Sequence, residues 1–149
     1  MRDGGIDFFG QGNEGKIPVY AVADGFLTRL LDRSDAVAIQ QEDPLQPGRK
    51  IWTLYDGMAS ADGRNSYISE EFLTASSVSV KAGHLIGYQG TWSGTPNWPM
   101  WVHVRFTVVD IGDQLPGTVT SMTFLDPASY LGLVLDASNP NMQTLRCNP

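Results

Sequence analysis

Short runs of β-type residues, interrupted by turn residues every few positions, constrain the fold of this chain more than any other feature. Sixteen glycines and nine prolines are spread among its 149 residues, and turn pairs such as Asp24-Gly25 end the apolar runs. No stretch has the periodicity of a long helix. The sequence therefore predicts one all-β domain with a mainly antiparallel sheet and at most short helical turns, at 69–73 and 126–131.

The expected strands differ in length but share valine, isoleucine and aromatic residues. They occupy 17–23, 26–31, 36–40, 51–55, 78–81, 85–90 and 101–109. The last of them is the clearest, because side chains on a strand alternate between its two faces. One face is apolar and is expected to join the core: Val102, Val104, Phe106 and Val108. The other is more polar and could line a groove: Trp101, His103, Arg105 and Thr107.

Length and charge set the class of protein. A chain of 149 residues fits one domain, which we expect to span 1–136, followed by a polar C-terminal tail over 137–149. The net charge of −6 and the absence of a basic block argue against nucleic acid and anionic membrane surfaces as partners. No apolar run is long enough to predict membrane insertion, and no signal peptide is recognisable at the start of this sequence.

Four sequence blocks, taken in order, resemble one known family. They are Gly4-Gly5-Ile6-Asp7-Phe8 with 17–25, then Trp52-Thr53-Leu54-Tyr55, then 80–90, and finally His103-Val104-Arg105-Phe106. This set resembles the lysostaphin-like, LytM-type zinc endopeptidases, which cut peptide cross-links in bacterial cell walls. The resemblance covers roughly residues 2–132 and implies an antiparallel sheet folded over a narrow groove.

The resemblance also implies where a zinc site would lie. In that family a His-x-x-x-Asp pair and the second histidine of a His-x-His motif bind zinc, and two further histidines orient water and substrate. Asp7 matches the aspartate ligand, whereas Asp3 stands in place of the first zinc histidine. Gly57, two residues after Tyr55, stands in place of one accessory histidine.

The late strand allows two alignments with the family motif. With Phe106 aligned, His103 matches the retained accessory histidine and Arg105 replaces a zinc ligand. A shift of two residues would make His103 the ligand and Trp101 the replaced residue. We favour the first alignment, because it keeps the phenylalanine and the alternation that follows it.

In either alignment most of the metal ligands and catalytic histidines are replaced. An arginine stays protonated and has no lone pair to give to a metal, so Arg105 is expected to pair with Asp7 or Asp3 instead. We therefore expect no cofactor, although zinc is the family's metal. Asp3 and Asp7 could alternatively bind calcium or magnesium weakly through oxygen, or serve only in turns and ion pairs. His103 is either a leftover catalytic imidazole or a hydrogen-bonded structural residue.

Aromatic residues near the late strand are the remaining candidates for substrate contact. Trp92, Trp98 and Trp101, with Tyr55, could line the groove and stack on sugars or hold a peptide, or they could simply pack within their loop.

The leading functional hypothesis is a peptidase-like domain without zinc-dependent activity, a pseudoenzyme that binds or regulates at the cell wall. Its partner would be a peptidoglycan peptide or a cell-wall hydrolase, and the resemblance implies a location in the cell envelope or outside the cell. The first alternative is an active endopeptidase with a rebuilt metal site. The second is a structural module of a larger envelope protein.

Overall fold

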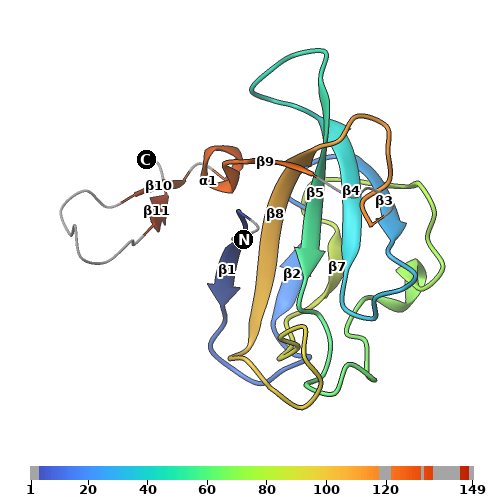
Figure 1. Cartoon of the computed structure of the whole chain (residues 1–149), viewed down its shortest axis with the longest axis vertical. Coiled ribbons are helices and arrows are strands. Elements are labelled where there is room, and N and C mark those ends of the chain that lie inside the picture. The colour runs from blue at the N-terminus through green and yellow to red at the C-terminus, as the bar shows by residue number, and fades with distance from the viewer. Residues whose placement is uncertain (1–3, 118–121, 132, 136–144, 148–149) are drawn as a thin grey trace.

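A single antiparallel sheet organises the molecule (Figure 1). The computed structural model describes residues 4–117, 122–131, 133–135 and 145–147. In these residues the strand order of the sheet is β1-β8-β5-β4-β3-β6, and β9 pairs with β8. The strands are β1 (Ile6–Phe9), β3 (Gly25–Arg29), β4 (Val37–Glu42), β5 (Lys50–Asp56), β6 (Val78–Val80), β8 (His103–Asp110) and β9 (Thr123–Leu125). The expected all-β class is confirmed.

The main sheet is covered on one face by a smaller sheet, which lies behind it in Figure 1. That sheet pairs β2 (Pro18–Tyr20) with β7 (Leu85–Tyr88). The core between the two sheets is apolar, because alternate residues of each strand face it. It contains Val19, Leu27, Val37, Ile39, Tyr55, Ile86, Val104, Phe106 and Val108. Of the apolar face expected for the late strand, Val104, Phe106 and Val108 lie in this core, whereas Val102 precedes β8 and is only partly buried.

The opposite face of the main sheet is divided into an apolar part and a polar part. Near one end of the strands Trp52, Leu54 and Val109 form a second buried cluster with Leu30, Ala36 and Ala38. At the other end, where β5 finishes and β8 begins, the same face carries charged side chains. Side chains pack over the apolar part, whereas the polar part lines a hollow at the surface and is therefore the candidate site.

Two short helices occur where the sequence predicts helical turns. The 3-10 helix η1 covers Glu70–Phe72 and buries Phe72. The helix α1 covers Pro127–Tyr130, and the Asp126 side chain accepts a hydrogen bond from the Ala128 backbone N–H, as expected of an N-cap. Beyond α1, β10 (Leu133–Leu135) pairs with β11 (Leu145–Cys147), at a distance from the main sheet (Figure 1). The proposed boundary near residue 136 stays a prediction.

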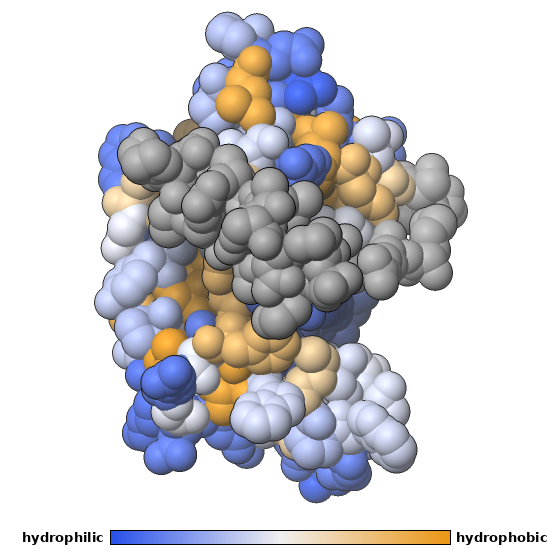
Figure 2. Space-filling view, turned by 90° about the vertical axis from the view of Figure 1, so that its left-hand side faces the viewer, coloured by the Kyte–Doolittle hydropathy of each residue, from blue (hydrophilic) through white to orange (hydrophobic). Residues whose placement is uncertain are grey.

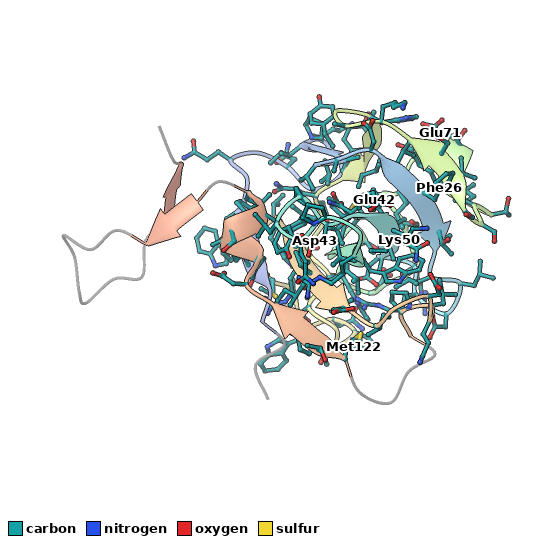
Figure 3. The ribbon with its side chains drawn as sticks, turned by 90° about the horizontal axis from the view of Figure 1, so that it is seen from above. Phe26, Glu42, Asp43, Lys50, Glu71 and Met122 are labelled. Atoms are coloured by element: carbon teal, nitrogen blue, oxygen red, sulfur yellow. The ribbon has the colours of Figure 1, made fainter. Side chains whose placement is uncertain are left out.

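Further hollows lie away from the polar part of the sheet. A cleft of about 180 Å³ between β2 and β8 is lined by apolar residues, among them Phe8, Val22 and Phe106, and Figure 2 shows apolar surface set between hydrophilic areas on the side that β1 faces. A second hollow, of about 250 Å³, lies near Phe26, Glu42 and Lys50, which are labelled in Figure 3. Among the described residues, none of the helices has the length and apolar character needed to span a membrane.

Candidate functional site

Three neighbouring strands bring charged residues into one row on the polar part of the sheet. Asp7 on β1 lies opposite Arg105 on β8, and Arg105 lies opposite Asp56 on β5. Because neighbouring strands are about 4.8 Å apart, the row places a guanidinium between two carboxylates. These three residues line a groove of about 330 Å³ together with Arg33, Asp35 and His103, and residues 92–94 and Met100 complete its walls. We call this the polar groove.

An ion pair occupies the centre of the polar groove. The Arg105 Nη1 donates to Asp7 Oδ1 over 2.9 Å, so the expected contact between these residues is confirmed. Both side chains are about three-quarters buried. Burial raises the pKa of the Asp7 carboxyl, with His103 acting in the opposite direction, and burial lowers the pKa of Arg105. Desolvation therefore opposes both charges, and the 2.9 Å hydrogen bond between them offsets part of that cost.

A second ion pair forms the wall of the polar groove between β3 and β4. Arg33 donates to both carboxylate oxygens of Asp35, from Nε over 3.1 Å and from Nη2 over 2.8 Å. Asp35 is 2% exposed and also accepts the backbone N–H of Gly57 over 2.9 Å. A buried carboxylate with three such donors is held rigidly, so it fixes the end of β5 against the β3–β4 turn.

Asp56 is the third carboxylate of the polar groove and the least well compensated. Its nearest cation among the described residues is Arg33, whose Nη2 lies 3.8 Å from Asp56 Oδ2. Burial is the main reason that the pKa of Asp56 is raised to about 7, and the neighbouring carboxylates of Asp35 and Asp7 add to it, while Arg33 opposes them. Asp56 is thus a carboxyl group that changes its charge near neutral pH.

His103 lies at the start of β8 and is only 2% exposed. Its Nδ1 is 2.8 Å from the carbonyl oxygen of Trp101. A carbonyl can only accept, so Nδ1 carries the hydrogen, and in the neutral ring Nε2 has the lone pair. Among the described residues no hydrogen bond to Nε2 is found.

Gly57 lies directly beside this nitrogen. A Cβ at Gly57 would be 2.8 Å from His103 Nε2, and the backbone there has a φ of +90°. A side chain at position 57 would therefore be strained and would collide with His103. The structure thus places His103 and Gly57 side by side. These are the two positions at which the resemblance implies accessory histidines, and the His103 imidazole faces a glycine.

The aromatic candidates separate in the structure. Trp92 lines the polar groove and packs against Gly63. Trp98 and Trp101 are 74% and 84% exposed and do not line that groove. Tyr55 is 2% exposed on the opposite face of the sheet, where its hydroxyl accepts the Val22 N–H over 2.9 Å. A role of Trp98, Trp101 and Tyr55 in binding stays a prediction.

The donor set of the polar groove does not fit zinc. Asp3 lies outside the described residues, and within them no group of three histidine, cysteine, aspartate or glutamate side chains is placed to hold a metal ion. Arg105 fills the space beside Asp7 and brings a positive charge, which repels a dication.

Sequence reasoning missed Arg33, Asp35 and Asp56 as members of the polar groove. Asp56 could have been found from strand alternation, because it follows Trp52 and Leu54 at two-residue intervals on β5. Arg33 and Asp35 lie in a turn after β3, and their position depends on the contact with Gly57, which is 22 residues from Asp35 in the sequence.

Comparison with known proteins supports the fold. No protein-family model matches this sequence, and no curated protein matches it. A solved structure from Ruminococcus gnavus ATCC 29149, described as an inferred glycyl-glycine endopeptidase lytM, is similar with a TM-score of 0.51 and 21% sequence identity. The similarity covers 83% of this chain and 43% of that chain, so this chain spans less than half the length of its structural neighbour. The fold is therefore LytM-like.

Proposed function

We propose that this chain is a peptidase-like domain that binds peptide at the bacterial cell wall and does not hydrolyse it through zinc. The observation that carries the proposal is the Arg105–Asp7 ion pair, which lies in the groove of a LytM-like fold at the position where the resemblance implies a metal. The groove itself is retained, with a volume of about 330 Å³. Binding can therefore persist without the metal that would activate water.

The alignment that pairs Arg105 with a zinc-ligand position is supported by the same geometry. Arg105 and Asp7 are direct cross-strand partners, and His103 Nε2 faces Gly57. Trp101, the replaced residue in the other alignment, is exposed and outside the groove. A location at the cell envelope, and a regulated hydrolase as a further partner, belong to the same proposal.

The proposal predicts that a soluble peptidoglycan stem peptide binds the full chain and that chelator does not change this. At ten times its Kd such a ligand adds about 1.4 kcal/mol to the free energy of unfolding, which raises the Tm of a domain of this size by about 3–6 °C. Met100→Trp, which fills the groove, should abolish the shift. Leu45→Trp adds the same side chain at an exposed residue outside the groove and should leave the shift unchanged.

Two other results would overturn the proposal and favour a different function. Cleavage of cross-linked peptide that chelator stops would identify an active endopeptidase with a rebuilt metal site. No binding and no cleavage, with a folded chain, would favour a structural module.

A further inference from the structure

The charges that line the polar groove do not balance. Arg105 is paired with Asp7 over 2.9 Å, and Arg33 is paired with Asp35 over 2.8 Å. Asp56 is left as a third carboxylate, with only the 3.8 Å contact to Arg33, whose short hydrogen bonds go to Asp35. When Asp56 is ionised, the groove is lined by three carboxylates and only two guanidinium groups. Its lining then has a net charge of −1 if His103 is neutral.

The polar groove also offers a second acceptor. His103 Nδ1 is engaged with the Trp101 carbonyl, so Nε2 of the neutral ring can accept a hydrogen bond. The imidazole is almost fully buried and lines the same groove as Asp56. The imidazole packs against Gly57, where a Cβ would be only 2.8 Å from Nε2, so its position in the groove depends on glycine there. A ligand donor bound in the groove could therefore hydrogen-bond to Nε2 of the neutral ring.

A group that complements this lining is a hydrogen-bond donor with one positive charge. A primary ammonium meets both conditions, because it carries three N–H donors and no acceptor. The ring of Trp92 on the groove wall can add a cation–π contact. An anion would meet the unbalanced carboxylate, and a dication would meet two guanidinium groups, so both are disfavoured.

We propose that the polar groove captures a primary ammonium group of its peptide ligand, with Asp56 as the counter-ion and His103 Nε2 as a second acceptor. This inference rests on the proposed function, since the ammonium belongs to the peptide that the groove binds. The ammonium is either the α-amine of a peptide or the side-chain amine of a lysine-like residue.

The raised pKa of Asp56 agrees with such a role. Arg33 and Asp35 from the β3–β4 turn, Asp7 from β1, and Arg105 and His103 from β8 all surround this carboxyl. With a pKa of about 7, Asp56 is partly protonated in the free chain, and a bound cation favours its ionised form. Binding of a side-chain amine, which stays charged over this range, should therefore strengthen between pH 6 and pH 7.5.

Titration calorimetry of the full chain in amine-free buffer tests the inference. The probes are alanyl-alanine amide, which has an α-amine, Nα-acetyl-lysine amide, which has only the side-chain amine, and N-acetyl-alanyl-alanine amide, which has neither. We expect one or both amine probes to bind and the acetylated probe not to bind. The tighter amine probe identifies the source of the ammonium.

Variants locate the site. Asp56→Asn keeps the shape of the side chain and should weaken binding of the amine probe by at least about 10-fold. Asp110→Asn is the matched control, because Asp110 is a partly buried carboxylate that contacts Arg49 and does not line the groove. It should bind the probe like the unmodified chain. The Tm of each variant, measured in parallel, confirms that it is folded.

The outcomes separate this inference from the proposed function. If the acetylated probe binds as tightly as the amine probes, the ammonium inference is overturned while peptide binding stands. If Asp56→Asn binds the amine unchanged, the inference is overturned as well, because the counter-ion is not Asp56. If neither the amine probes nor the stem peptide bind a folded chain, both the inference and the proposed function fail.

Discussion

Asp35→Ala is expected to lower the free energy of unfolding by about 1–3 kcal/mol, the cost of leaving a buried hydrogen-bond donor without its acceptor. Asp35 is 2% exposed and accepts hydrogen bonds from Arg33 and from the Gly57 backbone. The substitution leaves the buried Gly57 N–H without its acceptor, whereas the Arg33 side chain is 40% exposed and can be hydrated. The β5 end and the β3–β4 turn would separate, so the groove would lose a wall together with stability.

A nearby arginine enlarges this expected effect. Arg29 is 9% exposed, and its Nε and Nη1 make no hydrogen bond within the described residues. Burial lowers the pKa of Arg29, and the negative charge of Asp35 opposes this shift. Without that carboxylate the buried guanidinium loses its compensating charge.

Urea unfolding at pH 7 measures this loss, and Asp32→Ala provides the control. Asp32 is exposed in the same turn, so its substitution should change the free energy of unfolding by no more than about 0.5 kcal/mol. Equal, small effects of both variants would mean that Asp35 does not hold the groove wall.

Asp56→Asn is expected to remove a pH dependence from the stability of the fold. The folded-state pKa of about 7 lies above the ordinary value of 3.8, so between these values the folded state retains a proton that the unfolded state has released. The stabilisation is fully present at low pH and is lost as pH rises through 7. With 1.36 kcal/mol per pKa unit, the unmodified chain should lose about 3 kcal/mol between pH 5 and pH 8.5 from this group.

The asparagine resembles the neutral carboxyl and should not lose this contribution. Asp56→Asn should therefore become the more stable protein at pH 8.5, with a higher Tm than the unmodified chain in amine-free buffer. The control Asp110→Asn should keep the pH dependence. A parallel pH profile for Asp56→Asn and the unmodified chain would show that Asp56 is already ionised near its ordinary pKa in the folded state.

The residues of the late strand show why much of this fold could be predicted from the sequence. Alternation along β8 places Val104 and Phe106 in the core and His103 and Arg105 in the groove, and the structure has the same division. The pattern is reliable there because one face of the strand is buried against a second sheet, which fixes the register of every side chain.

The groove wall shows why the rest could not be predicted. Asp35 and Gly57 meet through one hydrogen bond between residues that are distant in sequence, and no local pattern specifies it. The pKa of Asp56 depends on burial and on charges from two other strands and a turn, so the residue looks ordinary in the sequence. Tyr55 is a candidate groove residue in the sequence, although strand alternation places it on the opposite face from Asp56.

The proposed function requires that the Arg105–Asp7 pair takes the place of a metal. Elemental analysis of the full chain, purified without chelator and dialysed against micromolar zinc, tests this most directly. We expect much less than one zinc per chain and no change in Tm when chelator is added. One zinc per chain, removed by chelator with a fall in Tm, would contradict the account and would identify a rebuilt metal site in the groove.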